Sequence, residues 1–156
     1  MSKSLARVAR ALETAGIEAR ILEMPGETRT AADAAREAGS ALDQIVKSIV
    51  FRGAASGHAK LFLTAGGNRV SADKASALAG EALGRADAGL VRAETGFAIG
   101  GVAPVGHLAP IPSWCDPRLM EFDLVWAAAG TPRHIFAVAP ADLLRLTGAR
   151  LADFTE

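Results

Sequence analysis

The sequence is short of several residue types. It has one cysteine, Cys115, no tyrosine, two tryptophans and six phenylalanines among 156 residues. A single cysteine cannot form an internal disulfide, which suits a reducing compartment. Its neighbours Trp114 and Asp116 bring no positive charge that would activate a thiolate, so we expect a structural role for it. So few aromatic residues also argue against a broad platform for stacking single-stranded bases.

An excess of charge and long apolar runs are lacking as well. Lysine plus arginine and aspartate plus glutamate number 17 each, so the formal net charge at pH 7 is zero. This balance argues against a general nucleic-acid binder held by a strong positive field. No stretch approaches the roughly 20 apolar residues of a membrane span, and residues 1–12 lack the continuous apolar core of a signal peptide. We therefore expect a cytoplasmic protein with no membrane partner.

The pattern of apolar residues and helix-breaking residues predicts one α+β domain over residues 1–156. Half of the residues are hydrophobic, which is enough for a proper core. The predicted helices cover about 5–12, 30–39, 71–83, 88–94 and 141–147, with Thr30 and Ser71 as N-caps. The predicted strands cover 17–24, 45–52, 60–65, 106–111, 122–129, 134–139 and 151–154. Because short strands come in hairpins with helices between them, we expect a mixed, mostly antiparallel, barrel-like sheet wrapped by helices.

The segment Ile45–Arg52 is the clearest predicted strand, and both of its faces are mostly apolar, as in a central strand. Lys47 stands in the middle of an apolar row formed by residues 45, 49 and 51. Lysine is rarely buried without a partner. Either its stem packs on apolar surface while the amine reaches water, or the amine points into a pocket to meet an anion.

The segment Thr95–Gly106 contains four glycines, one proline and no charged side chain. Glycine allows a ligand to approach the main chain closely. Such a loop can offer backbone donors and acceptors beside a small apolar pocket, or it can be only a tight bend between two elements. Its spacing matches neither nucleotide-binding fingerprint, because it lacks both G-x-G-x-x-G and a following Gly-Lys-Ser/Thr.

Four motifs, taken together, resemble one known family. They are Thr28-x-Thr30-Ala31-Ala32, Gln44-Ile45-Val46-Lys47-Ser48, the Thr95–Gly106 loop with its Gly101-Val102-Ala103-Pro104 core, and Gly130-Thr131-Pro132-Arg133-His134. Their order and spacing resemble the YbaK/ProX family of aminoacyl-tRNA deacylases, free-standing relatives of the editing domain of bacterial prolyl-tRNA synthetases. The resemblance covers nearly the whole chain. It implies hydrolysis of the ester that joins a wrong amino acid to the 3′ end of a tRNA.

The resemblance also implies roles for particular residues. Lys47 corresponds to the essential lysine of the family. Gly100, Gly101 and Pro104 correspond to its Gly-x-x-x-Pro loop, in which Gly101 is the expected catalytic residue. His134 stands in the hairpin segment that lines the amino-acid pocket, although some relatives have aspartate near that position. The residues expected to bind substrate are Thr28, Thr30, Ser48, Ile99, Gly100, Val102, Pro104 and His134.

The physical chemistry of these residues agrees with that role. An ammonium suits a phosphate oxygen, and backbone donors beside the glycines suit the oxyanion of an ester under attack. Glycine at position 101 would leave space for the ester or the amino acid. The sequence shows no Ser-His-Asp order and no Cys/His metal cluster, so we expect neither a metal nor a cofactor. The family is thought to rely on the ribose hydroxyl of the substrate to position water.

The expected function is therefore trans-editing. We expect the amino acid removed to be small and uncharged, of the alanine, cysteine, serine or 2-aminobutyrate type, because a charged side chain would lose hydration beside Ile99, Val102 and Ala103. The expected partner is the aminoacyl-adenosine end of a mischarged tRNA, in particular a tRNA for proline, with prolyl-tRNA synthetase as a further candidate. The alternative is a non-catalytic module that binds tRNA or a synthetase.

Four basic residues are candidates for a local surface that binds the tRNA acceptor stem: Arg52, Lys60, Arg69 and Lys74. For each of them, the sequence is equally compatible with an ordinary solvent-exposed position.

Overall fold

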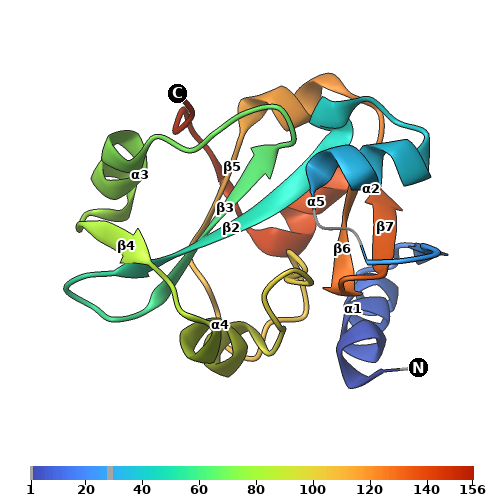
Figure 1. Ribbon diagram of the computed structural model, residues 1–156, viewed down its shortest axis with the longest axis horizontal. Coiled ribbons are helices and arrows are strands. Elements are labelled where there is room, and N and C mark those ends of the chain that lie inside the picture. Colours follow the sequence, from blue (N-terminus) through green and yellow to red (C-terminus); the bar gives the residue numbers. More distant parts are fainter. Residues whose placement is uncertain (1, 28–29) are drawn as a thin grey trace.

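The computed structural model describes residues 2–27 and 30–156 (Figure 1). Within these residues eight strands form one mixed sheet in the order β1-β7-β6-β2-β3-β5-β8, with β4 paired to β2. The strands are β1 (Arg20–Glu23), β2 (Ile45–Gly53), β3 (Ala59–Ala65), β4 (Leu83–Arg85), β5 (Ser113–Cys115), β6 (Val125–Thr131), β7 (His134–Val138) and β8 (Arg150–Leu151). The described strands leave the sheet open, because β1 and β8 are its two ends. The predicted α+β class is confirmed.

Both strand directions occur at the centre of the sheet. Strand β2 pairs with β3 and β4 in the antiparallel sense and with β6 in the parallel sense. Strand β7 pairs antiparallel with β1 and β6. Strand β5 lies parallel to both β3 and β8. Strand β2 therefore joins the β1-β7-β6 half of the sheet to the β3-β5-β8 half.

The helices lie around the sheet rather than in a single layer. They are α1 (Lys3–Thr14), α2 (Ala31–Ala38), α3 (Ala72–Ala79), α4 (Ala88–Thr95) and α5 (Pro140–Thr147), with short 3-10 turns η1 (Leu42–Gln44) and η2 (Pro117–Glu121). In Figure 1, α3 and β4 lie at the left of the view, and α1, β6 and β7 lie at the right. The predicted caps are confirmed for α2 and α3, where Thr30 accepts from the Asp33 N–H and Ser71 from the Lys74 N–H.

The main core joins α1, the centre of the sheet, α5 and the glycine loop. Leu5, Val8 and Leu12 from α1 are buried in the same cluster as Leu143 from α5. Loop residues Phe97, Val102, Ala103 and Val105 belong to that cluster too. The glycine loop is thus part of the core at its base, and its position depends on the elements that surround it.

One predicted strand is wrong, and one predicted helix is too long at its C-terminal end. The predicted strand over 106–111 is an irregular segment, and the strand comes later, at β5. Gly106 has a φ of +79°, which turns the chain, and Pro110 has no N–H to give to a ladder. The predicted helix over 71–83 ends at Ala79, because Gly80 adopts the left-handed conformation of a C-cap and the chain then forms β4.

The ends of other elements differ by a few residues from the prediction. Strand β1 is shorter than the predicted 17–24, and the predicted last strand over 151–154 is replaced by β8 and an isolated bridge between Val70 and Thr155. The prediction of Ala88–Glu94 as a helix and of the β6–β7 hairpin is confirmed.

Candidate active site

A cavity of about 360 Å³ lies where β2 and β6 separate. The two strands run parallel but pair only at Ile45–Trp126 and Val46–Ala127. Beyond these pairs the gap is bordered by β2, β6, the start of α2 and the glycine loop. Its described lining residues are Thr30, Ala31, Ala34, Ile45, Val46, Lys47, Ser48, Ile49, Gly100, Val102, Trp126, Ala127, Ala128 and Ile135.

Lys47 supplies the one charged side chain among these lining residues. Its Nζ donates a hydrogen bond to the backbone oxygen of Asn68, in the turn after β3. Burial lowers the pKa of Lys47, and the positive charge of Arg69 lowers it further, while Asp116 and Asp43 act in the opposite direction. In the part of the chain that the structure describes, Nζ has no second acceptor, so its other donors remain available to a ligand.

The turn that holds Lys47 is itself fixed by a buried carboxylate. Asp116 is 3% exposed, and its Oδ2 accepts from the side-chain nitrogen of Asn68 at 2.9 Å and from the Ala65 N–H at 3.1 Å. Asp43 accepts from the Gly67 N–H at 2.8 Å. Two acids therefore fix the turn whose carbonyl receives the lysine, which restricts where the amine can lie.

Ser48 follows Lys47 and points to the opposite face of β2. Its Oγ is shut off from solvent and, within the described residues, has no hydrogen-bond partner. Gly53 donates to His58 on the β3 side, so the alternate residues Val46 and Ser48 turn their backbone groups toward the β6 edge. No described pairing covers Ser48 on that edge. The cavity thus borders a stretch of strand edge without a described pairing partner, and the unsatisfied Ser48 hydroxyl lies buried beside it.

The glycine loop brings backbone to the same cavity. Its apex is a turn in which Gly101 N–H donates to the Ala98 oxygen at 3.1 Å. Gly100 lines the cavity with a φ of +95°, and a side chain there would meet no atom within 4 Å. Val102, 7% exposed, adds an apolar wall. A ligand in the cavity can therefore approach the main chain at Gly100.

Gly101 has a different role from the spatial one expected from the sequence. A Cβ at this position would lie 2.8 Å from the Cα and the carbonyl carbon of Thr131. The space beside Gly101 is thus filled by the β6–β7 turn, and it does not belong to the cavity. This glycine lets the loop pack directly on the hairpin backbone.

The structure brings together five of the predicted site residues and leaves others aside. Thr30, Lys47, Ser48, Gly100 and Val102 line the cavity. Ile99 is 58% exposed at the loop apex and does not line it. Pro104 is buried and borders a separate hollow. The His134 side chain is not part of the lining either, and its Nδ1 forms a 2.6 Å hydrogen bond with the Thr131 hydroxyl. Thr28 lies outside the described residues.

The apolar wall of the cavity was missed in the sequence analysis. Trp126 and Ile135 come from β6 and β7, and Ala31 and Ala34 from the face of α2 that packs against Trp126. The available signal was weak, because a tryptophan in a strand and alanines in a helix are ordinary core residues. These residues line a cavity because β2 and β6 separate beside them, and no local sequence pattern predicts that separation.

The other reactive side chains lie elsewhere. Burial raises the pKa of the Cys115 thiol to about 12, so this buried cysteine is not a ready nucleophile. Burial lowers the pKa of His107, whose Nε2 lies 2.7 Å from the Ala103 oxygen. Among the residues described, no group of three or more His, Cys, Asp or Glu side chains is placed to hold a metal ion.

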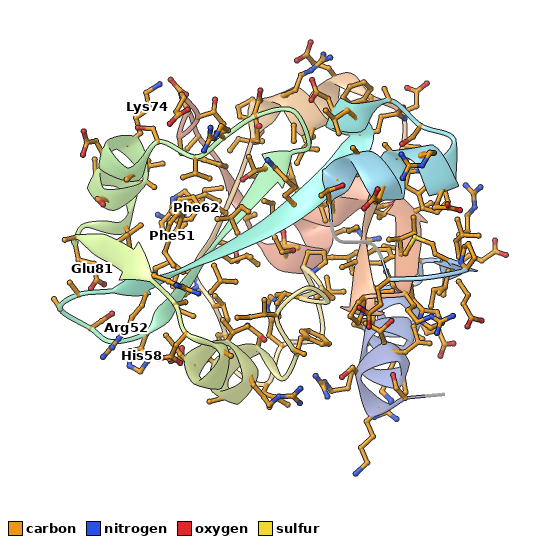
Figure 2. All side chains as sticks on the ribbon, viewed as in Figure 1. Phe51, Arg52, His58, Phe62, Lys74 and Glu81 are labelled. Atoms are coloured by element: carbon orange, nitrogen blue, oxygen red, sulfur yellow. The ribbon has the colours of Figure 1, made fainter. Side chains whose placement is uncertain are left out.

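The predicted basic candidates do not form one surface. Lys74 pairs with Asp153, and Lys60 lies 3.7 Å from Glu81. Figure 2 shows Lys74 beside α3, well away from Arg52, which lies near the β2–β3 turn. Arg69 is the candidate that adds positive charge near Lys47.

Comparison with known proteins places the chain in a family. Residues 25–146 match the model of the aminoacyl-tRNA editing domain. The chain belongs to this family. It carries an α+β fold with a mixed sheet, and Lys47, Ser48 and the glycine loop border one cavity.

Three solved structures are similar to this chain over nearly its whole length. One, described as a candidate trans-editing enzyme for prolyl-tRNA synthetase, is 48% identical with a TM-score of 0.92, covering 100% of this chain and 99% of that one. A structure from a study of epitope grafting by computational design is 46% identical, with the same TM-score and coverage. A hypothetical protein is 30% identical, with a TM-score of 0.87 over 96% of this chain and 99% of that one. In residues 2–27 and 30–156, no helix has the length and apolar character needed to cross a membrane.

Proposed function

We propose that this chain is a trans-editing aminoacyl-tRNA deacylase, which hydrolyses the ester between a small non-cognate amino acid and the 3′ end of a mischarged tRNA. The observation that carries the proposal is the amine of Lys47 in a mostly apolar cavity that is bordered by glycine-loop backbone. An ammonium is a compact charge that suits a phosphate or ribose oxygen of the terminal adenosine. The family match over residues 25–146 supports the reaction class.

The reaction needs an attack by water on the ester carbonyl. The bond between the carbonyl carbon and the ribose oxygen breaks, which releases the free amino acid and leaves a hydroxyl on the tRNA. We assign the stabilisation of the developing oxyanion or the orientation of the ester to the backbone at Gly100, with Ser48 as a further lining residue. The described lining contains no imidazole and no carboxylate. We therefore assign the positioning of water to the ribose hydroxyl of the substrate.

The cavity wall favours a small, uncharged amino acid. Ile45, Trp126 and Ile135 carry no charge to pair with a charged side chain, which would lose hydration beside them. Alanine, cysteine, serine and 2-aminobutyrate all satisfy this condition. The tRNA we propose is the one for proline, because a 48% identical chain is described as acting for prolyl-tRNA synthetase. A synthetase rejects a smaller amino acid by only about 1–3 kcal/mol per missing methylene, so a second hydrolytic site is useful.

The test is a deacylation assay on tRNA for proline charged in turn with alanine, cysteine, serine, 2-aminobutyrate and proline. We expect hydrolysis of at least one small-residue ester and sparing of the prolyl ester. Binding of these tRNAs without hydrolysis would favour the non-catalytic module instead. Rapid hydrolysis of the prolyl ester would contradict the proposed specificity while leaving the reaction class intact.

A further inference from the structure

Helix α1 carries an arginine that contacts both ends of the glycine loop. The Arg7 guanidinium donates to the backbone oxygen of Gly96 at 2.7 Å and to that of Gly106 at 3.2 Å. It also lies over the ring of Phe97, 4.7 Å from the centroid. These contacts span 89 and 99 positions of the chain. Helix α1 lies outside residues 25–146, over which the editing-domain model matches.

The two glycines leave room for this contact. Gly96 and Gly106 have φ values of +83° and +79°, a left-handed conformation that glycine adopts without a steric penalty. A Cβ at Gly96 would lie 2.5 Å from the Arg7 guanidinium, and a Cβ at Gly106 would lie 3.4 Å from the Arg7 backbone. The bases of the loop are therefore shaped around one arginine.

The same helix also supports the turn on which the loop rests. A Cβ at Gly130 would lie 2.8 Å from the Ser4 oxygen and 3.1 Å from the Phe97 ring. The loop packs on this turn through Gly101. Helix α1, the loop and the β6–β7 turn are thus in direct contact, and the loop continues from these contacts to Gly100 and Val102 at the cavity.

We propose that Arg7 is a positioning residue of the deacylation site: by holding the Gly96 and Gly106 carbonyls together, it sets where Gly100 and Val102 stand relative to Lys47. The proposal rests on the proposed function for its kinetic consequence, while the clamp itself is a property of the loop. Arg7 is not among the described residues that line the cavity. Its guanidinium fits this task because its planar fork can serve two carbonyl acceptors at once.

A matched control lies one turn further along α1. Arg10 borders the same surface hollow as Arg7, yet the structure gives its exposed side chain no hydrogen bond or ion pair among the described residues. Arg7→Gln and Arg10→Gln therefore remove the same charge from the same helix, but one of them alone removes the clamp. Arg7→Lys keeps the charge and offers a single nitrogen that cannot reproduce the fork.

The experiment measures hydrogen exchange and kinetics on the full-length variants. The Phe97 amide, which donates to the Thr95 hydroxyl, and the Gly101 amide, which donates to Ala98, report on the loop. For Arg7→Gln we expect exchange of these amides to accelerate at least about tenfold while β2 and β3 amides stay protected. We expect kcat to fall about 10- to 100-fold with KM changed less than about threefold. Arg7→Lys should lie between, and Arg10→Gln should match the unmodified protein.

Three results would overturn the proposal: unchanged loop exchange in Arg7→Gln, an equal change in Arg10→Gln, or faster exchange throughout the sheet together with a lower melting temperature. If Arg7→Gln does not fold, Arg7→Lys decides by the same amides. If the unmodified protein hydrolyses none of the charged tRNAs, the proposed function fails. The loop exchange still decides whether Arg7 holds the loop.

Discussion

The two ends of β2 have opposite characters. After its first two residues the strand separates from β6 and borders a cavity with Lys47 and small alanines, and the Ser48 hydroxyl beside it is buried without a described partner. At its end it is paired on both edges, with β3 and β4. There Phe51 packs against Phe62 (Figure 2). The Phe62 ring is also stacked on Trp114, with 4.9 Å between the ring centroids.

The difference shows how one strand combines stability with a binding site. The aromatic end buries large surfaces without polar groups, and such clusters contribute strongly to stability. The cavity end leaves polar groups without partners, and an unsatisfied buried hydroxyl costs about 1–3 kcal/mol. We infer that the first end compensates for the second. Substitutions at the two ends should therefore separate stability from activity.

The largest expected effect is on stability, at the aromatic end. Phe62 is fully buried and contacts Phe51, Trp114 and Phe154. Phe62→Ala should lower the free energy of unfolding by about 3–5 kcal/mol, through lost burial and a residual cavity. Denaturant unfolding measures this loss. Activity per folded molecule should stay within about twofold, and a larger drop at a temperature where the variant is still folded would mean that the two ends are coupled.

At the cavity end, Lys47→Ala should largely abolish deacylation. Loss of a charged contact to the substrate is worth roughly 2–4 kcal/mol, or some 30- to 1000-fold in rate. The melting temperature should not fall, because the amine is partly desolvated and its pKa is lowered by burial. Lys60→Ala, on β3 near the aromatic end and 3.7 Å from Glu81, is the control. A wild-type rate in Lys47→Ala would make this lysine structural.

A smaller effect is expected at Ser48. Ser48→Ala removes a hydroxyl that has no described partner, so the free energy of unfolding should stay the same or rise by about 1 kcal/mol. The rate of deacylation should fall about 3- to 10-fold, the value of one neutral hydrogen bond. Ser113→Ala provides the contrast, since that hydroxyl donates to Ile111 at 2.8 Å. Ser113→Ala should lose stability and keep its rate of deacylation. A Ser48→Ala variant that loses stability and keeps its rate would exclude a substrate contact for Ser48.

The smallest effect is expected at His134, which lies outside the cavity lining. This substitution tests whether residues next to the cavity influence amino-acid specificity. His134→Ala removes the hydrogen bond to Thr131, worth about 0.5–1.5 kcal/mol of stability. Relative rates for the alanyl, cysteinyl, seryl and 2-aminobutyryl esters should shift about two- to threefold, with tRNA affinity unchanged. Identical relative rates before and after the substitution would show that the histidine does not shape the amino-acid pocket.

The sequence contained enough to predict the elements on which the site depends. A lysine within an apolar strand and a glycine loop of unusual composition are local features, and the structure places Lys47, Gly100 and Val102 around one cavity. The helix N-caps at Thr30 and Ser71 could also be predicted, because capping depends on residues close together in the sequence.

The rest depends on contacts between distant segments. Gly101 looked like a residue that leaves space for substrate, yet its neighbour is the Thr131 backbone, 30 positions further on. Arg7 and Trp126 carry no local mark of their role, because each acquires it from elements far away in the chain. The prediction of a strand over 106–111 is wrong because the segment that pairs with β3 is β5, and this pairing depends on the arrangement of the whole sheet.

The parallel pairing of β2 with β6 has a consequence for how the protein is made. Ile45 pairs with Trp126 and Val46 with Ala127, so the pairing closes a segment of about eighty residues. The entropy of closing such a loop must be overcome before its contacts give any stabilisation. Long-range pairings of this kind also slow folding. A chain leaving the ribosome therefore presents Lys47 early but has no cavity until β6 has emerged.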